Sequence, residues 1–399
     1  MKKHYFNTYA GLPKTVYYLF AARLVNSMGF FVMPLFTLIL TQKLGMDKAS
    51  AGATAALMIL TQAPGVILGG KLADTIGRKK MMMLGNLLGA VFYLICSLGL
   101  TGKAMIVCII LAADCGALSR PAFDALIADL TRPEDRKKAY SLLYLGINIG
   151  MALSPMIGGL LFAHHLRLIF LLDAATTLAS TALIFFRVQE VYVCRVRTER
   201  QAVRLSLYTV FRQTPVLAVF LLLHFLYEFS YSQWSFMLPA QFGDLYAQNG
   251  ARFYSILTSV NAVTVIVMTP FLTGFTRKLR PLRAFAMAGI FYVTAYLGFS
   301  LGGHYGIYIV LAVLFTLGEI SAAIQVGAFV SNHAPAECLG RVNAFSSLVQ
   351  GASSAFGPLF MGQLLTTVSY ASGWRITAGI AAAAMAGFFL LDRKDRKAA

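Results

Sequence analysis

The sequence predicts an all-α integral membrane protein in which twelve transmembrane helices form two pseudo-symmetric six-helix bundles. Three observations predict this fold: the composition, the spacing of long apolar runs, and a repeat in the second half of the chain. Of the 399 residues, 58% are hydrophobic and only 13% are charged, and the mean hydropathy is +0.69. A single soluble core cannot bury so much apolar surface. The expected solvent is therefore a lipid bilayer.

Apolar runs of twenty or more residues recur along the whole chain. Such runs match the thickness of the hydrocarbon core, and a long run without strict alternation satisfies its backbone in lipid as a helix. The predicted helices cover residues 15–40, 48–73, 81–101, 104–128, 139–163, 167–188, 215–241, 250–276, 283–302, 305–333, 341–366 and 371–391.

The basic residues are distributed unequally between the two sides of this topology. The side that holds both termini carries 26 Lys and Arg residues, and the other side carries six. This bias follows the positive-inside rule and predicts a multi-pass protein of the cell membrane with both termini in the cytoplasm. It also explains the net charge of +18 without a nucleic-acid partner. The first apolar run is long enough to span and has no cleavage site after it, so we expect a retained helix.

An Arg-rich segment divides the chain into two halves that resemble each other. The predicted domains are an N-terminal bundle (1–188), a cytoplasmic linker (189–214) and a C-terminal bundle (215–399). Pro133 corresponds to Pro335 and Pro155 to Pro358, at offsets of 202 and 203 residues. A constant offset near half the length indicates a duplicated six-helix unit, the architecture of many secondary transporters with a substrate site between the repeats.

The stretch GGKLADTIGRKK forms the predicted cytoplasmic loop between the second and third helices. A glycine here permits a tight turn, and an arginine offers a forked donor to a carboxylate. We expect this charged cluster to hold one conformation and release it, with Asp129 at the end of the fourth helix as a further member. The alternative is a plain basic turn. The gating residues are Gly70, Asp74, Gly77, Arg78, Lys79 and Asp129.

Four ionisable residues lie near mid-depth in the predicted helices 1, 4, 7 and 10: Arg23, Asp114, Glu228 and Glu319. A charge at this depth is costly and indicates function by default. Arg23 can neutralise Asp114 in its own half, either as an ion pair or as a handle for a substrate anion. Glu228 and Glu319 then remain as sites for protons or for substrate charge. Internal ion pairs that only join helices are the alternative.

Other polar and aromatic residues in the helices allow two interpretations. Arg120 and Asp124 are four residues apart and can pair as a structural or relay element. Asp173, near the outer end of the sixth helix, is expected to be solvated. Aromatic rings beside a carboxylate bind cationic or amphipathic molecules, although such rings also serve as packing or interface anchors. Those around Glu228 are Tyr227, Tyr231 and Trp234.

The whole chain resembles the major facilitator superfamily, and within it the drug/proton antiporters of the lactococcal type. The loop fits the family signature G-x-x-x-D-x-x-G-R-K. GMALSPMIGG is similar to the antiporter motif G-x-x-x-G-P-x-x-G-G, with Ser154 in place of a glycine, and TLGEI resembles the segment whose Glu couples protons or binds cations. The second motif implies either close packing or occlusion of the pathway by Gly150, Pro155, Gly158 and Gly159.

The chain departs from that branch at two positions. Ile109 stands where the branch has an arginine in helix four, and Ser235 stands where it has an acid in helix seven. LGE in helix ten also resembles the proton-coupled oligopeptide transporters, which hold a zwitterion between an Arg and acids. Their helix-one signature E-x-x-E-R is absent, because the sequence reads YYLFAARLVN.

The sequence therefore predicts a secondary active transporter that works by alternating access. The expected activity is proton-coupled export of amphipathic or cationic small molecules by a monomer, and the alternative is proton-coupled uptake of zwitterions such as short peptides. No nucleophile elbow, zinc motif or P-loop indicates an enzyme, and the five cysteines lack ligand spacing. No cofactor or metal is expected. A scaffold or a channel explains the mid-depth charges and the repeat less well.

Overall fold

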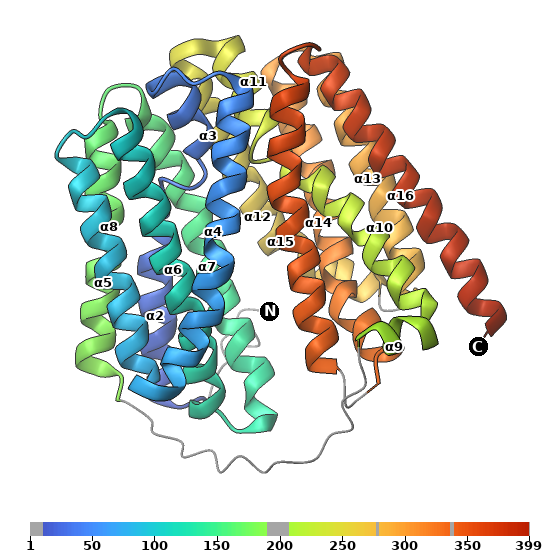
Figure 1. The fold of residues 1–399 in the computed structure, drawn as a ribbon, viewed down its shortest axis with the longest axis horizontal. Coiled ribbons are helices and arrows are strands. Elements are labelled where there is room, and N and C mark those ends of the chain that lie inside the picture. Colours follow the sequence, from blue (N-terminus) through green and yellow to red (C-terminus); the bar gives the residue numbers. More distant parts are fainter. Residues whose placement is uncertain (1–10, 190–206, 277–278, 336–338, 399) are drawn as a thin grey trace. The chain divides into compact units, whose positions relative to one another are not determined.

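The computed structural model describes residues 11–189, 207–276, 279–335 and 339–398, which form helices joined by short turns (Figure 1). The predicted linker, residues 189–214, lies largely outside the described residues, apart from its last part. The elements are α2 (Lys14–Met28), α3 (Phe36–Leu38), the π-helix η1 (Ile39–Lys43), α4 (Lys48–Ile76), α5 (Arg78–Ser97), α6 (Gly102–Leu130), α7 (Pro133–Phe162), α8 (Leu166–Arg187), α9 (Leu207–Gln213), α10 (Pro215–Ser232), α11 (Met237–Tyr246), the 3-10 helix η2 (Ala247–Asn249), α12 (Gly250–Thr276), α13 (Pro281–Leu301), α14 (Tyr305–His333), α15 (Leu339–Leu364) and α16 (Tyr370–Ala398).

The all-α membrane fold predicted from the sequence is confirmed. Nine stretches of the described residues are long and apolar enough to cross a membrane. Large apolar side chains such as Phe186, Phe271 and Leu390 remain more than 60% exposed on the helices. In a bilayer these side chains face lipid, so their exposure carries no penalty.

Two of the twelve predicted helices are interrupted, which the hydropathy pattern did not show. The first predicted helix ends at Met28 and resumes at Phe36, and the seventh ends at Ser232 and resumes at Met237. The first break is apolar, and the second contains only two polar residues, Gln233 and Ser235, between long apolar stretches. A hydropathy averaged over a membrane span therefore does not detect either break. Pro34 lies within the first break, two residues before α3, and Pro239 is the third residue of α11. A proline near a helix start is the local signal for a new helix.

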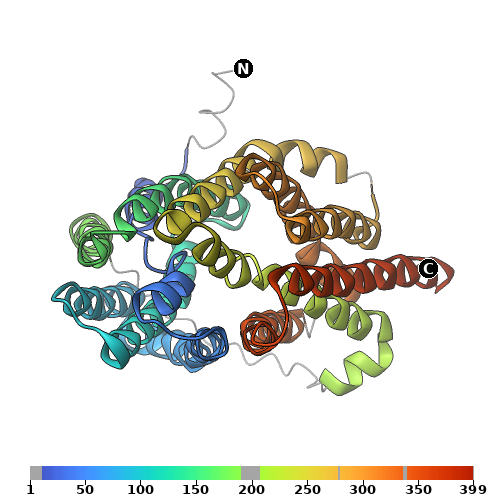
Figure 2. The ribbon, with the colours of Figure 1, turned by 90° about the horizontal axis from the view of Figure 1, so that it is seen from above.

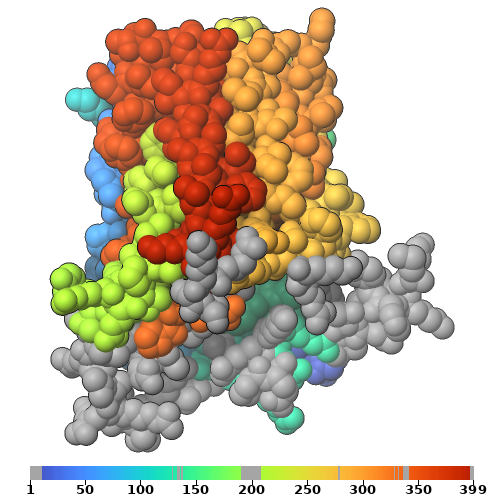
Figure 3. All heavy atoms as spheres, turned by 90° about the vertical axis from the view of Figure 1, so that its right-hand side faces the viewer, coloured from blue at the N-terminus to red at the C-terminus, as the bar shows by residue number. Residues whose placement is uncertain are grey.

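The chain divides into two compact units, each of which has its own core. Unit 1 comprises Met1–Gly45, Met58–Arg195 and Leu245–Val263, and unit 2 comprises Met46–Leu57, Val196–Asp244 and Thr264–Ala399. In unit 1, α2, α5, α6, α7 and α8 pack around aliphatic residues such as Val16, Leu126 and Ile184. In unit 2, α13 contacts both α14 and α16, and α16 lies alongside α13 on the face in Figure 3.

Unit 1 includes the first part of α12, and unit 2 includes the first part of α4; the remainder of each helix belongs to the other unit. In each unit, a glycine of another helix packs closely against this first part. In unit 1, Gly159 of α7 packs on Ala251 and Ser255 of α12. In unit 2, Gly362 of α15 packs on Gly52 of α4, at the same offset of 203 residues. Small residues let helices approach closely in lipid. Figure 2 shows the helices from above.

Candidate functional site

A cavity of about 370 Å³ within unit 2 brings together the two glutamates that the sequence places at mid-depth. Glu228 comes from α10 and Glu319 from α14. None of the twelve described residues that line this cavity is Lys or Arg. Besides the two glutamates, the lining residues are His224, Tyr231, Tyr292, Ala322, Ala323, Val326, Asn343, Ser346, Ser347 and Gln350.

Each carboxyl group has its own polar contacts. Tyr231 donates its hydroxyl to Oε1 of Glu319 at 3.0 Å, and Gln350 donates Nε2 to Oε2 of Glu228 at 3.2 Å. Nε2 of His224 lies 3.7 Å from Oε1 of Glu228, a distance that makes an ion pair only when the imidazole is protonated. Residues 224, 228 and 231 lie on one face of α10 because they follow helical spacing. His224, Tyr292 and Gln350 were missed from the sequence; a histidine four residues before a membrane glutamate was the available signal.

Only one of the three predicted pocket aromatics lines this cavity. Tyr231 does, whereas Tyr227 is 2% exposed and donates its hydroxyl to the carbonyl of Phe285 at 2.9 Å. Trp234 is also buried, with its ring stacked on Phe315 at 4.4 Å. The prediction that Tyr227 and Trp234 belong to a substrate pocket is therefore corrected: both rings pack in the core of unit 2.

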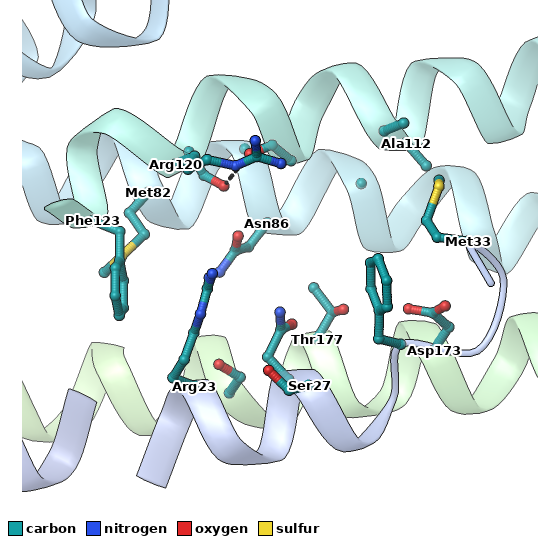
Figure 4. Close-up of a pocket in the computed structure, with 18 of the residues that line it drawn as sticks. Arg23, Ser27, Met33, Met82, Asn86, Ala112, Arg120, Phe123, Asp173 and Thr177 are labelled. Atoms are coloured by element: carbon teal, nitrogen blue, oxygen red, sulfur yellow. Dashed lines mark hydrogen bonds between the residues drawn. The ribbon is translucent and has the colours of Figure 1, made fainter. Parts of the chain in front are cut away.

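A second cavity, of about 410 Å³, lies within unit 1 between α2, α5, α6 and α8 (Figure 4). Arg23 reaches into it from α2, with the guanidinium carbon 5.0 Å from the centre of the Phe123 ring. Arg120 of α6 lines the same cavity. Asp114 is not among the residues that line it, and its Oδ1 accepts the hydroxyl of Thr61 at 2.9 Å.

The predicted ion pairs of Arg23 and Arg120 are absent from the described part of the chain. Arg23 lies beyond 4 Å of Asp114, and Arg120 lies beyond that distance from Asp124, although Asp124 acts on both guanidinium groups electrostatically. Nε of Arg23 is buried without a hydrogen-bond partner among the described residues. The sequence suggested these pairs from charge and spacing alone, and the structure does not bring their side chains into ion-pair contact.

Asp173 was expected to be solvated, and this prediction is wrong. Its side chain on α8 is 5% exposed, and Oδ2 accepts the backbone N–H of Val32 at 3.3 Å. Val32 lies in the break between α2 and α3, where the backbone donors have lost their helical acceptors. Asp173 therefore stabilises the interruption of the first membrane helix.

The predicted gating residues meet at the junction of α4 and α5. Gly77 has φ +103°, a conformation that disfavours any side chain, and it ends α4 one residue before α5 begins. Arg78 is 6% exposed and forms ion pairs with Asp129 of α6 and with Asp74, the latter at 3.4 Å. Lys79 donates Nζ to the carbonyl of Phe185 at 2.9 Å.

Gly70 lies one turn before this cluster on α4. A Cβ there would lie 3.9 Å from Cβ of Pro121 on α6. This is an ordinary van der Waals separation, so α4 and α6 are in contact at this point without excluding a larger residue.

The glycine-rich motif of α7 makes close contacts within unit 1. A Cβ on Gly150 would lie 2.6 Å from the carbonyl carbon of Ser27 and 2.8 Å from the backbone nitrogen of Met28, at the end of α2. A Cβ on Gly158 would lie 3.1 Å from Leu35, and one on Gly159 would meet Ser255. Pro155, inside α7, leaves a carbonyl one turn earlier without its helical donor. The contacts of Gly150 and Gly158 therefore hold α7 against the chain on both sides of the break between α2 and α3.

We expect Gly150→Ala to destabilise the protein, because the added methyl group meets backbone atoms that no rotamer change can move. Overpacking of this kind costs about 1–3 kcal/mol. Gly351→Ala is the matched control: Gly351 lies in α15 with nothing within 4 Å of its Cβ position. Thermal unfolding of the two purified variants compares them directly, and equal melting temperatures would contradict the close contact at Gly150.

Comparison with known proteins identifies the family. Residues 19–358 match the family model described as Major Facilitator Superfamily. The chain belongs to the major facilitator superfamily. This superfamily member is 27% identical to the multidrug resistance protein MdtH of Edwardsiella ictaluri over 86% of this chain and 84% of that protein. It is 22% identical to a Na(+), Li(+), K(+)/H(+) antiporter of Planococcus maritimus over 92% of each chain.

The fold is also shared with solved structures at low identity. A mutant of the peptide transporter POT in complex with sulfate has a TM-score of 0.80 and 16% identity, covering 96% of this chain and 95% of that one. This likeness concerns the fold alone. The family match and the long apolar helices together make the protein a multi-pass membrane transporter.

Proposed function

We propose that the protein is a proton-coupled exporter of amphipathic or cationic small molecules that works by alternating access. The observation that carries this proposal is the cavity of unit 2, in which two carboxyl groups and two tyrosines meet without a lysine or an arginine in the lining. A carboxyl group in such a site holds either a proton or a cation. Protons and a cationic substrate then compete for the same groups, and this competition is the chemical basis of antiport.

The contacts of the two glutamates suggest separate roles. Glu319, which accepts the hydroxyl of Tyr231, exchanges the coupling proton and attracts the cation, while the ring of Tyr231 offers its face to an apolar or cationic substrate. Glu228 lies next to His224 and Gln350, which hold its orientation. Asp114 and Arg23 belong to unit 1 and do not line this cavity.

The proposal also covers the topology of the protein in the membrane, its oligomeric state and its gating elements. Both termini face the cytoplasm, the two bundles are joined by the linker 189–214, and the protein works as a monomer in the cell membrane. The cluster of Arg78 with Asp74 and Asp129 serves as the cytoplasmic latch, and the glycines of α7 occlude the pathway. The similarity to a multidrug resistance protein and to a cation/proton antiporter supports the direction and the coupling.

The test is proton movement in proteoliposomes with a pH-sensitive dye inside. A gradient of a lipophilic cation such as ethidium is imposed, and the signal of protein-free liposomes is subtracted. Antiport predicts that protons move opposite to the cation at a rate proportional to the amount of protein. Absence of proton movement with every cation tried, in protein that is folded and inserted, would contradict the proposal.

Uptake of zwitterions is the second candidate, and the presence of Arg23 in the cavity of unit 1 favours it. A zwitterion needs a cation for its carboxylate, and Arg23 is a cation that lines a cavity. The same liposomes separate the two functions: dipeptide gradients that drive protons in the same direction as the peptide would replace antiport with symport.

A further inference from the structure

A third cavity, of about 440 Å³, lies in unit 1 at the end of α5 opposite to Arg78. The turn that joins α5 to α6 and the turn that joins α7 to α8 meet there, and we call this space the turn cavity. Its basic lining residues are His164, His165 and Arg167, and none of the described residues that line it is Asp or Glu. The volume is within the range of sites that hold small organic molecules.

Arg167 has a place prepared for its guanidinium but no partner for its charge. A Cβ on Gly99 would lie 2.5 Å from Nη2 and 2.8 Å from Cζ of Arg167, so the guanidinium occupies space that only a glycine leaves open. Gly99 has φ +97°, a conformation that itself favours glycine. Arg167 makes no hydrogen bond or ion pair with any other described residue. The donors of its guanidinium are therefore available to a ligand.

The positive-inside rule does not account for this arginine. The predicted topology puts Arg167 on the side that carries only six Lys and Arg residues. The two histidines stand beside it in the same cavity, and an imidazole donates at least one N–H whether it is neutral or protonated. Donors are thus concentrated at a place where the general charge bias predicts few.

Two long helices begin at the turn cavity and add to its positive potential. α6 begins after Thr101 and α8 begins after His165, and neither residue caps its helix with a side-chain hydrogen bond. The first N–H groups of a helix lack acceptors within the helix and carry the positive end of its dipole. The potential of both helix ends therefore acts in the same direction as the charge of Arg167.

The remaining lining is apolar, which suits a ligand that is more than a small ion. The buried side chains of Cys96, Met105 and Phe170 form an apolar wall. Leu168 lines the cavity, Leu171 follows it by about one turn on α8, and both are exposed on a helix able to span a membrane. An apolar surface thus leads from the cavity toward the lipid, whereas a free inorganic ion would leave this surface unused.

We propose that the turn cavity binds the phosphate group of an anionic phospholipid, with Arg167 as the main partner of the phosphate and the two histidines as further donors. An arginine fork binds phosphate through two parallel hydrogen bonds. α5, α6 and α8 are all able to span a membrane, so a cavity at their ends lies at the level of the lipid headgroups. Neither candidate transport function uses this part of unit 1, so the lipid site does not depend on them.

Binding to the purified protein in detergent micelles tests the proposal. The probes are dioctanoyl-phosphatidylglycerol, dioctanoylglycerol and inorganic phosphate: the first has both the phosphate and the apolar body, and each of the others has one of the two. Calorimetry, with protein-free micelles subtracted, should detect the phospholipid and much weaker binding of the other two. Arg167→Gln should raise the Kd for the phospholipid by about ten-fold or more, and Arg167→Lys by less, because lysine keeps the charge but loses the fork.

The matched control is Arg252→Gln, which removes an exposed arginine near the start of α12, outside the turn cavity, and should leave the Kd unchanged. Without lipid, Arg167→Gln should melt with the wild type, because Arg167 has no partner among the described residues. The double variant His164→Gln with His165→Gln should weaken binding several-fold.

Three results would overturn the proposal: equal affinity for the phospholipid and dioctanoylglycerol, no binding above protein-free micelles, or an unchanged Kd in Arg167→Gln. Inorganic phosphate bound as tightly as the phospholipid would assign the site to a free ion and overturn the lipid as its ligand. Cation-driven proton movement in liposomes is measured separately, so either proposal can fail while the other stands.

Discussion

Glu319→Gln is expected to abolish proton movement driven by a cation gradient. Glutamine has nearly the same volume as glutamate and can still accept the hydroxyl of Tyr231, so the cavity keeps its shape. It cannot release a proton or carry a negative charge, so the exchange of proton for cation has no site. Dye-loaded proteoliposomes with equal amounts of wild-type and variant protein measure the loss.

Two further variants show whether the loss belongs to the carboxyl group of Glu319. Asp47→Asn removes a carboxylate that caps α4 outside the membrane, where hydrogen bonds from Ser50 lower the pKa of Asp47. Asparagine caps a helix equally well, so wild-type proton movement is expected. Tyr231→Phe removes only the hydrogen bond and should slow proton movement without abolishing it. A wild-type rate in Glu319→Gln would show that another group carries the proton.

Helix positions were largely predictable, because the thickness of the bilayer fixes the length of each apolar run. The predicted run 250–276 coincides with α12, and 305–333 coincides with α14. The breaks after Met28 and Ser232 were not predictable from hydropathy, since each is short and has long apolar stretches on both sides. Their stability depends on tertiary contacts, such as that between Asp173 and Val32, which the sequence does not reveal.

The candidate site shows the same limit at the level of side chains. The sequence places Glu228 and Glu319 at similar depth in one half of the chain, and the structure brings both into one cavity. Charge matching alone suggested the pair of Arg23 with Asp114. Asp114 instead accepts the hydroxyl of Thr61, and the guanidinium of Arg23 lies over the ring of Phe123. A count of charges does not include such local partners.

Arg78→Gln is expected to cause a large loss of stability at the junction of α4, α5 and α6. Arg78 is 6% exposed and pairs with Asp129, whose side chain is 4% exposed. Removal of one partner from a buried pair leaves the other charge without compensation, which costs about 3–5 kcal/mol. The melting temperature of the purified variant should fall accordingly. Lys71→Gln, which removes an exposed charge from α4, is the matched control and should melt with the wild type.

The double variant Arg78→Gln with Asp129→Asn separates stability from gating. Two neutral amides carry no buried charge, so much of the lost stability should return. If the pair serves only to hold the helices, proton movement in proteoliposomes should return with stability. If the pair is a latch that opens and closes in each cycle, the double variant should be stable and still transport slowly, because the attraction that favours the latched state is gone. Full stability in Arg78→Gln alone would contradict the buried ion pair.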